Sequence, residues 1–313
     1  MTQIGIIGFG SQAKAFSANL LDSGFNITII LRSNSPSLAI AREQKFQVIN
    51  FEKQKIPSEI KHLIMLTPDE THEKILSLIT ELNPGLNFCF LFAHGYSFIK
   101  ENLKEKFPQH SFALLAPKAI ASELRERYLQ KEKLVGVIDT SHCNSQKQFI
   151  EIIAAKMGLT KLITSTFKDE TRADLFSEQT LLCSLLPYGA LKSYEYLVHK
   201  GIDPELAFVE CWMEVKLIAD AMLDKGPVGY LNLISSNALI GGEKAQKKIF
   251  DEDYNKKLDS LWEDIENGSF FREIDAMNVS KLKEEVINKW SRHSLQASYQ
   301  NFKGHANHES TNN

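Results

Sequence analysis

The feature that most constrains this chain is a change of rhythm near residue 164. Before it, short apolar runs alternate with amphipathic stretches, and after it apolar residues recur at helical spacing. Strands that alternate with helices predict a doubly wound parallel sheet with helices on both faces. Strands are expected at residues 4–8, 26–31, 47–50, 62–66, 87–92, 111–115 and 134–138, and helices at 11–23, 37–44, 71–82 and 98–106.

The second half of the chain is predicted to be all-α. At about 150 residues per domain, 313 residues correspond to roughly two domains. We predict an α/β domain over residues 1–164, a helical domain over residues 165–302 and a disordered tail over residues 303–313, which is rich in His, Asn and Ser. The helices expected in the second half lie at residues 169–199, 204–223, 253–267 and 280–298.

Composition excludes several classes of protein. The net charge of −3 lacks the basic excess of a nucleic-acid binder, so no nucleic-acid partner is expected. The apolar runs are too short to span a bilayer, and no basic leader precedes the first strand, so neither a membrane partner nor a targeting segment is expected. The four cysteines form no CxxC pair and are typical of reduced thiols, which favours a cytoplasmic protein.

A glycine-rich turn joins the first predicted strand to the first predicted helix. Its sequence, Gly8-Phe9-Gly10-Ser11-Gln12-Ala13, fits the G-x-G-x-x-A form of the dinucleotide fingerprint. The first glycine permits a tight turn, the second lets the backbone approach a pyrophosphate, and the helix N-terminus offers N–H groups to the phosphates. A plain turn would show the same letters, but the position between strand and helix favours a Rossmann-type cofactor site.

The end of the second strand indicates which nucleotide is bound. NAD sites usually place Asp or Glu there to accept a hydrogen bond from the ribose 2′-hydroxyl. Here Leu31 is followed by Arg32-Ser33-Asn34-Ser35-Pro36-Ser37, without a carboxylate. Because an arginine and several hydroxyls suit a 2′-phosphate, we predict NADPH, with a polar surface loop as the alternative.

Two pairs of carboxylates stand four residues apart in the helical half. They are Asp174 with Glu178 and Glu210 with Glu214, both within apolar sequence. Like charges at this spacing repel on one helix face and are costly to bury, and a hard divalent ion such as Mg²⁺ would resolve both problems. The alternative is that they lie on solvated faces or pair with Lys168, Arg172 and Lys216.

A series of short motifs follows one another in a fixed order. They are Gly8-Phe9-Gly10-Ser11-Gln12, Asp22-Ser23-Gly24, Leu66-Thr67-Pro68-Asp69-Glu70, Phe92-Ala93-His94-Gly95, Ala116-Pro117-Lys118, Thr166-Phe167-Lys168-Asp169-Glu170-Thr171, Asp174-Leu175-Phe176-Ser177-Glu178-Gln179, Glu210-Cys211-Trp212-Met213-Glu214-Val215-Lys216-Leu217-Ile218 and Asn267-Gly268-Ser269-Phe270-Phe271-Arg272-Glu273. In this combination the chain resembles ketol-acid reductoisomerase (acetohydroxy acid isomeroreductase) in its short, class I form. The resemblance runs from Ile4 to about Glu273.

The resemblance implies a reaction. The family shifts an alkyl group in a 2-hydroxy-2-alkyl-3-keto acid of the 2-acetolactate type with the help of Mg²⁺. It then reduces the product with NADPH to a 2,3-dihydroxy acid, in valine and isoleucine biosynthesis. Mg²⁺ suits the first step as a Lewis acid, and the nicotinamide suits the second as a hydride donor.

The resemblance also implies roles for single residues. His94 and Lys118 match the active-site His and Lys beside the nicotinamide, and Glu214 is the residue expected to act in proton transfer. Asp174 and Glu178 match metal ligands of one subunit, with Glu210, Glu214 and the substrate-binding Ser235 supplied by the partner of a homodimer. The cofactor contacts implied are Gly8, Phe9, Gly10, Ser11, Gln12, Arg32, Ser35, Ser37, Thr67, Pro68 and Asp69.

Several positions depart from the family's pattern and mark a divergent member. Ala119-Ile120-Ala121-Ser122 replaces G-P-G-H after Lys118, His72 replaces a Gln near the cofactor, and residues 236–240 lack two acidic positions. Losing the glycines is expected to narrow the pocket. Three alternatives therefore stay open: a reductase of another 2-keto acid, a non-catalytic NADPH-binding protein, and a metal-free relative such as a pyrroline-carboxylate reductase or 3-hydroxyacid dehydrogenase.

Overall fold

The computed structural model describes residues 2–309, with side chains described through residue 304. It forms two compact units, Met1–Ala173 and Asp174–Asn313. Among the described residues, no helix combines the length and the apolar character needed to cross a membrane.

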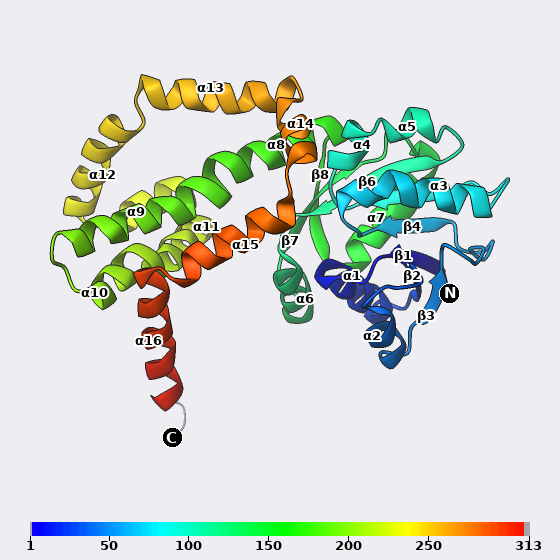
Figure 1. Cartoon of the computed structure of the whole chain (residues 1–313), viewed down its shortest axis with the longest axis horizontal. Coiled ribbons are helices and arrows are strands. Elements are labelled where there is room, and N and C mark those ends of the chain that lie inside the picture. The colour runs from blue at the N-terminus through cyan, green and yellow to red at the C-terminus, as the bar shows by residue number, and fades with distance from the viewer. Residues whose placement is uncertain (1, 310–313) are drawn as a thin grey trace. The chain divides into compact units, whose positions relative to one another are not determined.

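A single eight-stranded sheet organises the first unit (Figure 1). The strand order β3-β2-β1-β4-β5-β6-β7-β8 contains the order of a Rossmann-type doubly wound fold, which confirms the predicted fold class. Neighbouring strands are parallel except β6 and β7, which are antiparallel. The strands are β1 (Gln3–Ile7), β2 (Asn26–Leu31), β3 (Gln47–Asn50), β4 (His62–Met65), β5 (Cys89–Phe92), β6 (Ser111–Pro117), β7 (Leu134–Asp139) and β8 (Leu159–Thr164).

Helices bury both faces of this sheet. Successive strand residues point to opposite faces, so Ile6 and Ile7 lie in two separate hydrophobic cores. Residues of α1, α6 and α7 pack in the core that contains Ile6, and residues of α3, α4 and α5 pack in the core that contains Ile7. The helices are α1 (Ser11–Asp22), α2 (Leu38–Glu43), η1 (Asp69–Thr71), α3 (His72–Leu82), α4 (Tyr96–Lys100), α5 (Leu103–Lys106), α6 (Ala121–Gln130), η2 (Asn144–Gln146) and α7 (Lys147–Lys156).

Three elements of the first unit carry weak sequence patterns and were not predicted. Helix α6 is mostly polar and contributes Leu124 to the core, and α7 contributes a short run at Ile150, Ile153 and Ala154. Strand β8 lies at the edge of the sheet with most of its side chains exposed. A one-sided edge strand shows no continuous apolar run, which explains why the sequence did not indicate it.

The second unit is helical, as predicted, and contains two π-helical segments, η3 and η4. Helix α11 is broken at Gly226 (φ +67°), which precedes Pro227. A small core gathers around Leu191, Tyr194 and Phe208. The helices are α8 (Phe167–Ser177), η3 (Glu178–Leu185), α9 (Leu186–His199), α10 (Pro204–Phe208), η4 (Val209–Met213), α11 (Glu214–Leu233), α12 (Ser236–Ile249), α13 (Glu252–Glu266), α14 (Ser269–Ala276), α15 (Val279–Ser291) and α16 (Ser294–Glu309).

The division between the units falls inside α8. Its first turns bury Phe167, Glu170 and Thr171 in the first unit, whereas the sequence places the boundary before this helix, at residue 164. At the other end, α16 runs to Glu309 through residues for which the sequence predicts a disordered tail. Residues 310–313 of that tail lie outside the described residues.

Candidate active site

The glycine-rich turn lies at the carboxyl end of β1, where the strand order switches from β2 on one side to β4 on the other. Gly8 has φ +97°, and a Cβ there would collide with the Leu66 carbonyl, so both conformation and space require glycine. A Cβ on Gly10 would meet no described atom within 4 Å. Gly10 precedes α1, and no side chain of the described residues caps this helix end. The open Gly10 backbone and the uncapped helix N-terminus fit a pyrophosphate.

Phe9, Ser11 and Gln12 complete the turn. The Phe9 side chain is buried and packs edge-on against Phe46, with 5.5 Å between ring centroids. Ser11 and Gln12 form the first turn of α1. The contribution of Phe9 to a cofactor site would therefore come from its backbone, while its ring anchors the turn in the core.

The predicted 2′-phosphate loop follows β2. The Ser35 N–H donates to the Arg32 carbonyl, the Ser35 hydroxyl accepts from the Ser37 N–H, and Ser37 is the N-cap residue of α2. A carboxylate that the sequence did not single out also reaches this loop: Glu52 Oε2 accepts from the Ser33 N–H at 2.8 Å. This hydrogen bond from the Ser33 backbone lowers the pKa of Glu52, so the loop holds a negative charge beside Arg32.

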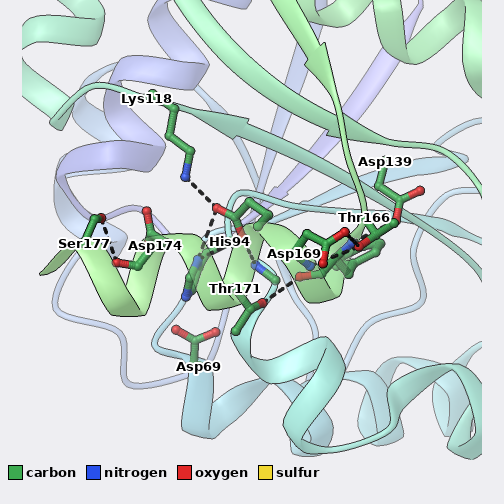
Figure 2. Close-up of polar contacts among 12 residues, drawn as sticks. Asp69, His94, Lys118, Asp139, Thr166, Asp169, Thr171, Asp174 and Ser177 are labelled. Atoms are coloured by element: carbon green, nitrogen blue, oxygen red, sulfur yellow. Dashed lines mark hydrogen bonds and ion pairs between the residues drawn. The ribbon is translucent and has the colours of Figure 1, made fainter. Parts of the chain in front are cut away.

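A compact cluster joins His94, Lys118 and Glu170 (Figure 2). Lys118 Nζ lies 2.7 Å from Glu170 Oε1, and His94 Nδ1 lies 3.2 Å from Oε2. The Gly95 N–H also donates to Glu170 Oε2, at 2.9 Å. The Glu170 side chain is 1% exposed, whereas His94 and Lys118 are partly exposed. A buried carboxylate thus orients two groups that reach solvent.

The cluster forms near the carboxyl ends of β5 and β6, and the carboxyl end of the antiparallel β7 lies level with the end of β5. In the sheet register, Phe92, Leu114 and Asp139 lie side by side on β5, β6 and β7. His94 follows β5 by two residues and Lys118 follows β6 by one. Asp139 accepts from the Phe167 N–H at 2.9 Å, which fixes the start of α8 at the level of β5. Glu170 is one turn further along α8 and so reaches His94.

Local sequence supports the start of α8. The Thr166 hydroxyl accepts from the Asp169 N–H, as in the first half of a capping box, and donates to the Asp169 carboxylate, each at 3.0 Å. Gly95 then lets the His94 segment approach the helix, because a Cβ on Gly95 would collide with Thr171 and with the Phe167 carbonyl. The glycine of Phe92-Ala93-His94-Gly95 is thereby explained by close packing.

Opposing effects act on the Glu170 carboxylate. Burial raises its pKa, but hydrogen bonds and charge from His94 and then Lys118 outweigh this, and the net pKa is lowered. Glu170 is therefore ionised at neutral pH. Glu170 lies within one of the sequence motifs but had no predicted role. Its position on the same helix turn as the apolar Phe167 indicates that its side chain is buried, but it does not indicate which residues the carboxylate contacts.

The two predicted metal-ligand pairs lie at junctions between α- and π-helix. Asp174 lies in α8 (Figure 2), one turn after Glu170. Glu178 begins η3. Glu210 lies within η4, and Glu214 begins α11. Single π turns within helices often occur at functional sites. The sequence left open whether these carboxylates surround a metal ion or lie on solvated faces, and Glu178, Glu210 and Glu214 are exposed in the single chain.

The structure does not unite the two pairs within one chain. Among residues 2–309, no group of three or more potential ligands within 4.8 Å contains Glu178, Glu210 or Glu214. The donors are carboxylate oxygens, which suit Mg²⁺. Ser235 caps α12, its hydroxyl accepting from the Ala238 N–H at 3.2 Å, and is exposed. Its predicted contact with substrate stays a prediction.

The loop after Lys118 carries the departures noted in the sequence. Lys118 is followed by Ala119 and Ile120, and Ile120 directly precedes α6 with 71% of its surface exposed. An exposed branched apolar side chain thus lies two residues after Lys118, at the position of the proline in the G-P-G-H pattern.

Comparison with known proteins covers almost the whole chain. Residues 1–162 match the family model of the acetohydroxy acid isomeroreductase NADPH-binding domain, and residues 167–304 match that of the ketol-acid reductoisomerase C-terminal domain. A ketol-acid reductoisomerase (NADP(+)) of Helicobacter acinonychis (strain Sheeba) is 32% identical over 299 residues, covering 90% of this chain and 87% of the relative. One of Xanthomonas euvesicatoria pv. vesicatoria (strain 85-10) is 31% identical over 292 residues, with the same coverage.

Solved structures agree with this assignment. An NADH-preferring ketol-acid reductoisomerase from an uncultured archaean superposes with a TM-score of 0.84 at 25% identity, covering 97% of this chain and 94% of that one. A pyrroline-5-carboxylate reductase from Coxiella burnetii, with a TM-score of 0.55, 13% identity and coverage of 84% of this chain and 96% of that one, shares the fold alone. The chain belongs to the ketol-acid reductoisomerase family of oxidoreductases.

Proposed function

We propose that this protein converts a 2-hydroxy-2-alkyl-3-keto acid of the 2-acetolactate type into a 2,3-dihydroxy acid, using NADPH and Mg²⁺, in branched-chain amino acid biosynthesis. The observation that carries the proposal is the buried Glu170 that holds both His94 and Lys118 at the strand ends of a dinucleotide-binding fold. The family membership supports the same reaction. When bound, NADPH supplies a hydride and Mg²⁺ supplies Lewis-acid polarisation.

The chain's own residues bind the cofactor and manage protons. Gly8 and Gly10 would admit the pyrophosphate to the N-terminus of α1, and the Arg32 loop would take the 2′-phosphate. Lys118 holds a proton on Nζ, 2.7 Å from Glu170 Oε1, where a neighbouring substrate oxygen could receive it. Glu170 keeps His94 and Lys118 oriented, since it accepts from the Gly95 N–H as well.

We propose that Asp174 and Glu178 hold Mg²⁺ together with Glu210 and Glu214 of a second copy of this chain. Exposed apolar side chains along α11 and α12 support a homodimer. Leu223 is 75% exposed and Val228 is 72% exposed, and among the described residues α11 buries none of its own. Gln179, directly after Glu178, has a buried side-chain nitrogen with no hydrogen-bond partner among the described residues. A buried donor of this kind favours completion by another molecule.

The test is NADPH oxidation with 2-acetolactate, with and without Mg²⁺. We expect Mg²⁺-dependent turnover in the wild type, its loss in Asp174→Asn, and no change in Asp253→Asn, which removes an exposed carboxylate of α13. Turnover restricted to 3-hydroxy-3-methyl-2-ketobutyrate would instead identify a reductase without the alkyl shift. The altered loop at Ile120, next to Lys118, is the reason to measure both acids. NADPH binding without turnover on either acid would contradict the proposal.

Glu52 leads to a prediction about the choice of cofactor. Its ionised carboxylate bonds to Ser33 inside the loop expected to hold the 2′-phosphate, and like charges repel there. Glu52→Gln is expected to increase the affinity for NADPH relative to the affinity for NADH by about two- to fivefold at low salt. The increase is expected to be smaller at high salt, because the site is exposed and salt screens its charges. Dissociation constants for both nucleotides at two ionic strengths test this, with Glu59→Gln, also exposed, as the control. An unchanged NADPH-to-NADH ratio would contradict it.

A further inference from the structure

A buried histidine connects the loop after β4 with helix α4. His72, at the start of α3, is 4% exposed. Its Nδ1 lies 2.6 Å from the Ser97 hydroxyl, and its Nε2 lies 2.8 Å from the Thr67 carbonyl oxygen. Both ring nitrogens are therefore hydrogen-bonded, Nε2 to the loop after β4 and Nδ1 to α4.

The partners define the protonation state of this ring. The Thr67 carbonyl can only accept, so Nε2 carries the hydrogen and donates to it. Nδ1 of a neutral ring is then an acceptor, and the Ser97 hydroxyl donates to it. The neutral His72 thus satisfies both contacts at once.

The two segments carry groups that the proposed function uses. Thr67 opens the segment Thr67-Pro68-Asp69, which the sequence predicts to contact the cofactor. Its hydroxyl also accepts from Thr71, at 3.1 Å, within the turn that leads to His72. Ser97 lies in α4, three residues after His94. The His72 ring is therefore a direct polar link between the predicted cofactor segment and the segment that bears His94.

We propose that His72 is a positioning residue that holds the Thr67–Asp69 loop in its NADPH-binding geometry, and that protonation of its ring weakens NADPH binding at acid pH. The proposal rests on the proposed function only in taking NADPH as the cofactor.

The surroundings of the ring confine its protonation to acid pH. Burial lowers the pKa of His72 and outweighs Asp69 and Glu70, which raise it, while His94 lowers it further. Phe92 packs edge-on against the ring, with 5.4 Å between centroids. At neutral pH the ring is therefore uncharged, and its 3.6 Å approach to the Asp69 carboxylate is no ion pair.

Protonation changes which partner Nδ1 prefers. The imidazolium donates from both nitrogens, so Ser97 can no longer donate to Nδ1. The Asp69 carboxylate, already 3.6 Å away, then becomes the stronger acceptor. Because Asp69 belongs to the cofactor segment, a shift of this contact from Ser97 to Asp69 would disturb the loop itself.

Two substitutions separate the hydrogen bonds of His72 from the protonation of its ring. His72→Gln can still donate to the Thr67 carbonyl and accept from Ser97, but it does not titrate. His72→Leu loses both hydrogen bonds. The matched control is His110→Gln, which replaces another buried histidine whose pKa is lowered to about 4 and which bonds to Thr80 and Phe88.

The measurement is the dissociation constant of NADPH, followed by nucleotide fluorescence, together with KM and kcat from pH 8 to pH 5. We expect the wild-type constant to rise about tenfold towards pH 5, the His72→Gln constant to stay flat and equal to the wild type at pH 8, and the His72→Leu constant to be about tenfold higher throughout. The His110→Gln profile is expected to follow the wild type.

An acid-side rise that persists in His72→Gln would overturn the proposal, as would wild-type affinity in a folded His72→Leu protein. These outcomes differ from failure of the proposed function. If the protein binds NADPH without turning over either keto acid, the dissociation constants still test His72. If the wild type does not bind NADPH at any pH, the proposal about His72 fails together with the cofactor assignment.

Discussion

Glu170→Gln is expected to lower kcat by about 100-fold or more, the range for losing a group that controls acid–base catalysis. The substitution keeps the shape of the side chain but removes the charge that holds His94 and Lys118. The amide offers one acceptor oxygen in place of two and no charge, so it cannot hold both His94 and Lys118 as the carboxylate does. Because Glu170 acts through these neighbours, the pH profile of kcat is expected to change while the KM for NADPH changes little.

The control for this experiment is Lys168→Gln, which alters the exposed face of the same helix. Stability gives a second readout. The folded-state pKa of Glu170 is lowered, so its contribution is present above the unfolded-state value of about 4.3 and is lost as pH falls through the folded value. The stability difference between wild type and Glu170→Gln is therefore expected to shrink below about pH 4. Wild-type kcat in Glu170→Gln would refute the role given to this residue.

Two inactive variants are expected to restore activity when they share a dimer. Asp174→Asn and Glu214→Gln should each abolish Mg²⁺-dependent turnover, since each removes a proposed metal ligand. In a mixed dimer with shared sites, one site carries both substitutions and the other carries neither. If chains pair at random, half the dimers are mixed, so co-expression is expected to recover about a quarter of wild-type activity.

The result distinguishes two arrangements of the metal site. A site built within one chain would show no recovery, because every chain carries one substitution. The control pairs Asp174→Asn with Glu178→Gln, which both fall on the same side of a shared site and should not complement each other. Differently tagged chains purified in two steps provide the mixed dimer itself, for which we expect about half of wild-type activity.

Much of the fold follows from local pattern. The turn at Gly8, the strands β1 to β7 and the helical second half all carry periodicities that a single sequence shows. The elements that escaped, α6, α7 and β8, contribute few buried residues or lie at the sheet edge. The antiparallel direction of β7 was also not predicted, because the sequence of the connection through α6 does not show whether β7 runs with or against β6.

The site divides in the same way. His94 and Lys118 were identified through the family resemblance of the motifs that contain them, and the structure places each of them just after a strand of the sheet. Glu170, Glu52 and His72 were not assigned a role, because no local sequence pattern indicates which residues they contact. Their importance lies in partners 76, 19 and 25 residues away, respectively at His94, Ser33 and Ser97.

The sequence by itself determined the cofactor turn, the class of fold, and the carboxylate pairs at Asp174 and Glu210, because these depend on residues close together in the chain. Only the tertiary structure decided that Glu170 is a buried acceptor for His94 and Lys118, and that His72 links Thr67 to Ser97. The physical reason is that burial and hydrogen-bond partners depend on which strand ends become neighbours. That order is set by packing across the whole sheet.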